Sequence, residues 1–221
     1  MIARTLLVKA AELLEKYPIV AITGPRQSGK TTLAQQLRPD YKYINLELEE
    51  NRAFAAADPH GFLQSNRDGV ILDEAQFVPS LFPYLKHYTD QRGHAGEYIL
   101  TGSQQFLLLE NITQSLAGRV GMLQLLPFSM PELASAVLLP TSPEELIFMG
   151  SYPRLYDKGI APTDFYPNYV RTYVERDVRQ VLNVGDLRLF RQFLSACAGR
   201  VGQRANFLEL GNVLGIDSKT V

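Results

Sequence analysis

Eight consecutive residues, 24–31, have the types and spacing that a phosphate-binding loop requires. They read Gly-Pro-Arg-Gln-Ser-Gly-Lys-Thr. In such a loop the backbone N–H groups surround a chain of phosphates, the lysine reaches the terminal phosphates and the last hydroxyl binds Mg²⁺. Arg26 could instead be a solvated side chain. We predict that the nucleotide is bound by this loop and the next residue, namely Gly24, Pro25, Arg26, Gln27, Ser28, Gly29, Lys30, Thr31 and Thr32.

The segments on either side of the loop support this interpretation. Residues 18–23 form an apolar run typical of a buried strand, and residues 31–38 have the pattern of a helix. A helix N-terminus carries a partial positive charge, which favours phosphate at that position. The sequence therefore predicts a strand, a phosphate loop and a helix in direct succession.

A second group of polar residues ends another apolar run, at residues 70–76. Asp73 is expected to hold Mg²⁺, directly or through water, and Glu74 to act as the general base that activates a water molecule. The alternative is an ordinary solvated turn. Gln76 could sense the phosphate, although a surface position is the simpler expectation. Asn45, at the end of the preceding predicted strand, could gate Glu74 by a hydrogen bond or could lie in a turn.

The segment 99–103, Ile-Leu-Thr-Gly-Ser, places further polar residues at a strand end. If this strand neighbours the phosphate loop, Thr101 or Ser103 could orient the attacking water, and we include Ser103 among the catalytic candidates. Alternatively, Ser103 only caps the helix that follows.

Arg119 is the last catalytic candidate, beside Lys30, Glu74 and Ser103. It directly precedes a predicted strand, from which an arginine could reach the nucleotide of a neighbouring subunit and stabilise transition-state charge. The alternative is a surface arginine near a helix C-terminus.

Strand and helix patterns alternate along the first 130 residues. Nearly continuous apolar strands favour a parallel sheet covered on both faces, so we expect an α/β P-loop NTPase fold with five parallel strands between helices, followed by an all-helical segment. The predicted strands are 18–23, 41–47, 69–74, 96–101 and 120–126. The predicted helices are 2–16, 31–38, 51–57, 81–92, 104–118 and, later, about 165–182. We predict an ATPase core over 1–130, a helical extension over 131–200 and a third part over 201–221.

Residues 206–221 resemble a helix-turn-helix, with Gly215 at the turn and a second helix beginning at Ser218. This pattern makes DNA a candidate partner of the C-terminal part. Because the sequence stops within that second helix, we expect the chain to be a fragment of a longer protein.

Composition restricts the class of protein. The chain has 221 residues and a formal net charge of −1, which gives no general attraction to nucleic acid. It lacks an apolar run of about 20 residues and the features of a signal peptide. We therefore expect a cytoplasmic protein without a membrane partner.

Taken together, the motifs resemble a family of predicted prokaryotic AAA-type ATPases. The resemblance covers nearly the whole chain and rests on Gly-Pro-Arg-Gln-Ser-Gly-Lys-Thr-Thr-Leu, Leu-Asp-Glu-Ala-Gln, Leu-Thr-Gly-Ser, Ser-Leu-Ala-Gly-Arg-Val, Leu-Pro-Phe-Ser-Met-Pro-Glu-Leu, Gly-Ser-Tyr-Pro and Tyr-Val-Glu-Arg-Asp-Val. It implies that Lys30, Thr31, Asp73 and Glu74 are the Walker-type residues. It also implies a winged-helix-like part and a C-terminal domain, suspected to be nuclease-like, that this sequence does not contain.

The expected function is ATP binding and Mg²⁺-dependent ATP hydrolysis coupled to a conformational change. A homo-oligomer is a candidate form of the active protein. Two alternatives stay open: a nucleotide-gated DNA-binding switch with little turnover, and a small-molecule P-loop kinase. The Asp-Glu pair argues against the kinase. The sequence has no Asn-Lys-x-Asp motif, which argues against a GTPase.

Overall fold

The computed structural model describes residues 2–103, 108, 112, 115–174 and 186–217. The chain forms two compact units, Met1–Phe165 and Tyr166–Val221, and each is described by itself. The boundary between the two units, after Phe165, differs from the domain boundaries at 130 and 200 that the sequence predicts.

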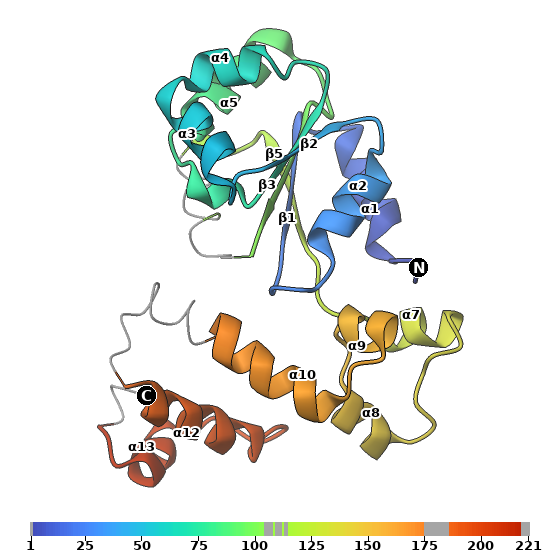
Figure 1. Cartoon of the computed structure of the whole chain (residues 1–221), viewed down its shortest axis with the longest axis vertical. Coiled ribbons are helices and arrows are strands. Elements are labelled where there is room, and N and C mark those ends of the chain that lie inside the picture. Colours follow the sequence, from blue (N-terminus) through green and yellow to red (C-terminus); the bar gives the residue numbers. More distant parts are fainter. Residues whose placement is uncertain (1, 104–107, 109–111, 113–114, 175–185, 218–221) are drawn as a thin grey trace. The chain divides into compact units, whose positions relative to one another are not determined.

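The first unit is built on one parallel sheet (Figure 1). Its strands are β1 (Ile19–Thr23), β2 (Lys42–Asn45), β3 (Val70–Asp73), β4 (Tyr98–Gly102) and β5 (Val120–Gln124). The order across the sheet is β2-β3-β4-β1-β5, and every pairing is parallel, as predicted. In this order β4 and β5 flank β1, although both are far from it in sequence. The carboxyl ends of β3, β4 and β1 therefore lie at the same edge.

Helices cover both faces of this sheet. They are α1 (Leu6–Leu14), α2 (Lys30–Leu37), α3 (Glu49–Ala57), α4 (Pro59–Gln64) and α5 (Leu81–Arg92), with a 3₁₀ turn at Ala75–Phe77. Side chains of a strand alternate between faces, so Ile19 and Ala21 enter one core with residues of α3, α4 and α5. Val20 and Ile22 enter a second core with residues of α1 and α2. Figure 1 shows the same division of helices between the two faces.

Two elements at the start of the unit differ from the prediction. The first helix begins at Leu6 rather than at residue 2, which leaves Arg4 and Thr5 ahead of it as polar anchors. The helix α4 was not predicted from the sequence. That helix has proline at its first position and is capped by Asp58, whose carboxylate accepts a hydrogen bond from the Gly61 N–H. The Asp58-Pro59 pair therefore begins a helix directly after the predicted helix 51–57.

The part of the first unit after β5 is helical, as predicted. It contains α7 (Met130–Ser135), α8 (Pro143–Met149), α9 (Pro153–Lys158) and the beginning of α10 (Pro162–Tyr169). The expected continuous helix over 165–182 is wrong in its described part, because a π-helical turn, Val170–Val174, follows α10. Pro167 lacks an N–H inside this helix, and the Thr172 hydroxyl bonds to the Asn168 carbonyl, so the regular pattern is interrupted. Residues 175–182 lie outside the described part.

The second unit contains α12 (Leu187–Ala198) and α13 (Phe207–Leu214). Asn206 caps α13 through a hydrogen bond from the Glu209 N–H, and Gly215 ends it in the left-handed conformation. These features agree with the first helix and turn of the expected helix-turn-helix. The second helix, from Ser218, falls on residues that are not described, as does most of the predicted helix 104–118. DNA binding therefore stays a prediction.

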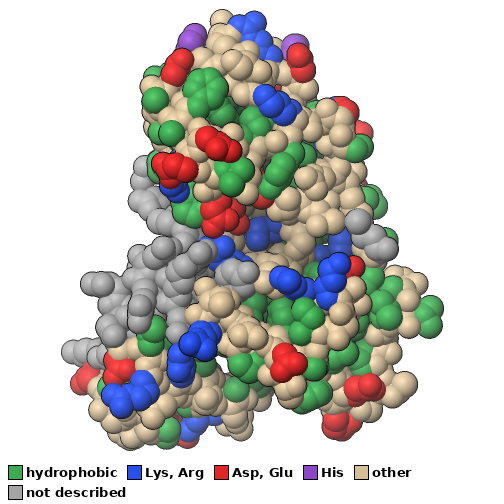
Figure 2. All heavy atoms as spheres, viewed as in Figure 1, with side chains coloured by type: hydrophobic (Ala, Val, Ile, Leu, Met, Phe, Trp, Pro, Cys, Tyr) green, Lys and Arg blue, Asp and Glu red, His purple; other side chains and the backbone are tan. Residues whose placement is uncertain are grey.

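Within the described residues, no helix combines the length and the apolar character needed to cross a bilayer. On the face drawn in Figure 2, hydrophobic side chains form small groups between charged and polar ones.

Candidate nucleotide-binding site

The phosphate loop connects β1 with α2 and depends on two glycines. Gly24 has a φ of 143° and Gly29 a φ of 95°, values that L side chains rarely adopt. Gly29 is also the N-cap of α2, so the first turn of that helix follows the loop directly. A Cβ at Gly24 would lie 2.1 Å from the Leu125 carbonyl oxygen. The loop therefore passes against the segment after β5 with no space for a side chain.

Lys30 points back into this loop. Its side chain is buried, and Nζ donates hydrogen bonds to the carbonyl oxygens of Gly24 at 3.1 Å and Pro25 at 2.9 Å. The Ser28 side chain is fully buried, and its Oγ has no hydrogen-bond partner among the described residues. A buried cation and, two residues earlier in the same loop, a buried hydroxyl without a partner among the described residues suit a phosphate group, which would supply acceptor oxygens.

The remaining loop residues differ in their exposure to solvent. Arg26, for which a solvated position was considered, is buried. Gln27 has a φ of 60°, in the left-handed region, and Pro25 is half-buried. Thr32 is exposed on the first turn of α2.

Asp73, at the carboxyl end of β3, accepts hydrogen bonds from three hydroxyl groups. Thr31 Oγ1 lies 3.2 and 3.0 Å from its two carboxylate oxygens, and Tyr43 Oη donates to Oδ2 at 2.7 Å. The third donor is the Thr101 hydroxyl of β4. Partial burial and the bond to Asp73 raise the pKa of Tyr43, so this phenol stays protonated and keeps donating. The Thr31 hydroxyl and the Asp73 carboxylate form an oxygen donor set that fits Mg²⁺.

Glu74 follows Asp73 and has a left-handed backbone, with φ 57° and ψ 47°. This conformation is uncommon for a residue with a side chain and clusters at functional sites. Its N–H donates to Thr101 Oγ1 at 3.3 Å. One carboxylate oxygen, Oε2, accepts bonds from Gln76 Nε2 at 2.5 Å, Ser103 N at 3.1 Å and Ser103 Oγ at 2.9 Å. The carboxylate is thus held in one orientation between β3 and β4.

The structure therefore brings most predicted site residues to one edge of the sheet. Lys30 and Thr31 come from the segment after β1, Asp73 and Glu74 from the end of β3, and Ser103 from the end of β4. Parallel strands end at the same edge, and the order across the sheet makes β1, β4 and β3 neighbours.

Two residues of this site were not among the predicted site residues. Gln76, for which a surface position was expected, is buried against Glu74, and Tyr43 reaches Asp73 from the neighbouring strand. The available signals were a tyrosine hydroxyl on a neighbouring predicted strand and a polar side chain two residues after the acidic pair. Asn45, considered as a gate for Glu74, instead accepts a bond from the Glu47 N–H at 2.8 Å, as expected for a turn residue.

Arg119 lies at the other edge of the sheet. It precedes β5, and its carbonyl accepts a hydrogen bond from the N–H of Ile19, the first residue of β1. The phosphate loop follows the other end of β1, four residues and about 13 Å away. The guanidinium pairs with the Asp90 carboxylate at 2.5 and 2.9 Å, and this hydrogen bonding lowers the pKa of Asp90. Arg119 is thus remote from the candidate site of its own chain.

A family model described as an AAA domain matches residues 16–134, which is more than half of the chain. The chain belongs to the AAA domain family. The matched region contains the five strands, the phosphate loop and Asp73 to Ser103, so the AAA domain supplies the whole candidate site. The family and the fold together support nucleotide binding in general terms, and they confirm the resemblance to AAA-type P-loop ATPases. A second model, described as a domain of unknown function, matches residues 141–221.

One solved structure shares the fold of this chain, and two uncharacterized proteins are similar to it in sequence. The Walker-type ATPase PABY2304 of Pyrococcus abyssi has a TM-score of 0.60 at 15% identity over 97% of this chain and 89% of that one. Uncharacterized proteins of Mycobacterium bovis (Mb2031c) and Mycobacterium tuberculosis (Rv2008c) are each 30% identical over 174 residues. That match covers 76% of this chain but only 38% of each relative's length.

Proposed function

We propose that this AAA domain binds ATP and hydrolyses it in the presence of Mg²⁺. One observation carries the proposal: Lys30, the Thr31–Asp73 hydroxyl–carboxylate pair and the Glu74 carboxylate lie at one edge of the sheet. An ammonium group for the phosphates, an oxygen donor set for the metal and a base beside them are what phosphoanhydride hydrolysis requires.

In the binding step, the loop amides and Lys30 receive the phosphate chain. The two loop carbonyls that Lys30 contacts are replaced by phosphate oxygens, which are stronger acceptors because they are charged. Thr31 and Asp73 are the residues that would hold Mg²⁺, which neutralises phosphate charge when bound. Tyr43 and Thr101 keep the Asp73 carboxylate oriented throughout.

In the hydrolysis step, a water oxygen attacks the γ-phosphorus and the bond to the β–γ bridging oxygen breaks, which yields ADP and phosphate. Glu74 accepts the water proton as general base. Gln76 and Ser103 donate hydrogen bonds to Oε2, so we assign proton uptake to Oε1 of the same carboxylate. We further propose that Ser103 orients the water, that the catalytic core lies within residues 1–130, and that the useful output is a conformational change.

Removal of Lys30 tests the binding step. Lys30→Ala is expected to weaken ATP binding by at least about 100-fold, since it removes a buried charge-assisted contact to the phosphates. Affinity is measured by calorimetry, and phosphate release is measured with Mg²⁺ and with excess EDTA, which should abolish turnover. The exposed Lys16 provides a control, Lys16→Ala, with unchanged affinity. Parent-like ATP binding by Lys30→Ala would show that the site is assigned wrongly.

We also propose that Arg119 acts on the nucleotide of a neighbouring subunit in a homo-oligomer. The guanidinium is partly exposed, and its partner Asp90 is exposed, so the ion pair is weak and can be exchanged for a phosphate. Arg119→Ala should then lower turnover only at protein concentrations that allow assembly. Asp90→Ala, which frees the arginine, should leave turnover equal or higher. Turnover per chain that is independent of concentration, or equal losses in both variants, would make Arg119 a structural residue.

A further inference from the structure

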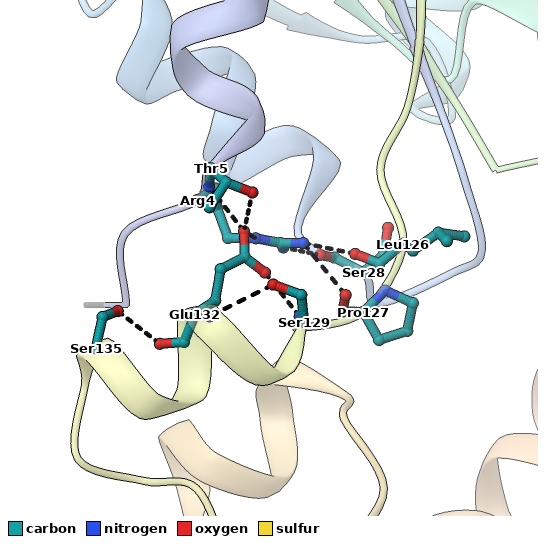
Figure 3. A network of polar contacts seen from close by, with 8 residues as sticks. All are labelled: Arg4, Thr5, Ser28, Leu126, Pro127, Ser129, Glu132 and Ser135. Atoms are coloured by element: carbon teal, nitrogen blue, oxygen red, sulfur yellow. Dashed lines mark hydrogen bonds and ion pairs between the residues drawn. The ribbon is translucent and has the colours of Figure 1, made fainter.

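A single arginine near the start of the chain connects the phosphate loop to the helical part of the first unit. Arg4 lies just ahead of α1, and its side chain is only 8% exposed. Figure 3 shows its guanidinium between three segments: the phosphate loop, the connection after β5, and α7. Nη1 donates to Ser28 O at 2.8 Å, Nη2 to Leu126 O at 2.6 Å, and Nε to Glu132 Oε1 at 3.1 Å.

Glu132 holds the other side of this contact. Its Oε1 also accepts bonds from the N–H and the hydroxyl of Thr5, at 2.8 and 3.1 Å, and its Oε2 accepts one from Ser129 N at 2.8 Å. Burial raises the pKa of the Glu132 carboxyl, but these backbone bonds and the Arg4 charge outweigh burial, so that pKa is lowered. Both members of the ion pair are buried and charged, and each has several hydrogen-bond partners.

The bond to Ser28 has a direct consequence for the loop. The Ser28–Gly29 peptide is trans, so its C=O and N–H groups point in opposite directions. When Arg4 binds the Ser28 carbonyl, the Gly29 N–H is turned to the side away from Arg4. That N–H belongs to the stretch of loop amides that surround phosphates in this motif. The guanidinium also lies beside Gly29 itself, since a Cβ there would be 3.5 Å from Nη1.

We infer that Arg4 is a positioning residue for nucleotide binding, which presets the Gly29 amide by holding the Ser28 carbonyl. The inference rests on the proposed ATP site. The charge of Arg4 is neutralised by Glu132, so Arg4 acts on the geometry of the loop rather than by attracting phosphate. A planar fork with three donor nitrogens is needed to reach three segments at once, and lysine, a point donor on a flexible stem, cannot replace it.

The test compares ATP affinity with stability in Arg4→Ala, Arg4→Lys and a control at a similar ion pair. Arg92 is a suitable control: it pairs with the buried Glu97 at 2.9 Å and lies over the Tyr88 ring at 4.9 Å. Arg4 likewise lies over the Phe128 ring at 4.9 Å. Arg4 and Arg92 variants should all lower the melting temperature. Only the Arg4 variants should weaken ATP binding, by about tenfold or more, as expected when a charge-assisted hydrogen bond is lost.

Turnover separates positioning from catalysis. For Arg4→Lys, KM for ATP should rise by about the same factor, while kcat at saturating ATP stays within about twofold of the parent. Glu132→Gln, which keeps the side-chain shape but loses the charge, should weaken binding in the same direction by a smaller factor. This variant and Arg4→Lys decide the matter if Arg4→Ala does not fold.

Two results would overturn the inference: parent-like ATP affinity in Arg4→Lys and Glu132→Gln, or an equal loss of affinity in Arg92→Ala. Lys30→Ala distinguishes failure of this inference from failure of the proposed function. If Lys30→Ala loses ATP binding and the Arg4 variants do not, only the role of Arg4 is wrong. If Lys30→Ala binds ATP normally, the ATP site itself is wrong.

Discussion

Glu74→Gln is expected to bind ATP with the affinity of the parent and to hydrolyse it about 10² to 10⁴ times more slowly. That factor is the usual contribution of a positioned general base. Glutamine has nearly the same shape, and its amide oxygen can still accept the two bonds from Ser103. It cannot take up a proton, so the water would have to be deprotonated without a base. The measurements are single-turnover phosphate release and the Kd of ATP.

The exposed Glu50 of α3 offers a matched control for this substitution. Glu50→Gln makes the same change in charge on the same unit and should leave both turnover and affinity unchanged. Hydrolysis by Glu74→Gln at the parent rate would show that another group is the base. A loss of affinity of similar size to the loss of turnover would assign Glu74 to binding rather than to proton transfer.

Gly24→Ala is expected to reduce both stability and ATP binding strongly. Besides the positive φ, the added methyl group would lie 2.1 Å from the Leu125 carbonyl oxygen. That carbonyl cannot move away easily, because the Leu125 N–H bonds to the Thr23 carbonyl at 2.8 Å and the Leu125 side chain is buried. We expect a loss of more than about 3 kcal/mol in the free energy of unfolding, from backbone strain and overpacking together. ATP affinity should fall more than about tenfold, because the loop must shift.

The substitution Gly93→Ala separates backbone strain from overpacking. Gly93 ends α5 with a φ of 67°, and a Cβ there would meet no atom within 4 Å. Gly93→Ala therefore costs only the strain of the left-handed backbone, about 1 to 2 kcal/mol, and should not change ATP affinity. Denaturant unfolding and calorimetry give both quantities for both variants. Equal destabilisation in the two variants would mean that the contact with Leu125 relaxes without cost.

Local patterns in the chain were sufficient to predict much of this molecule. The strand, loop and helix at residues 19–37 and the strand that ends at Asp73 lie where the sequence predicts them, because each depends on residues that are close together in sequence. The parallel sheet followed from strands that alternate with helices. Individual boundaries were less accurate, as at α1, because Arg4 and Thr5, just ahead of that helix, are held by hydrogen bonds to the distant Glu132.

Contacts between distant segments were decided by the tertiary structure alone. The order β2-β3-β4-β1-β5 determines that Thr101 and Tyr43 reach Asp73, and that Ser103 reaches Glu74. Arg119 came to the opposite edge because it precedes its strand instead of following it. Arg4 and Glu132 are 128 residues apart, and no periodicity or motif relates them. The loop sequence thus predicts a phosphate site, whereas the packing of remote segments around Ser28 and Glu74 determines how the proposed binding and catalytic groups are held.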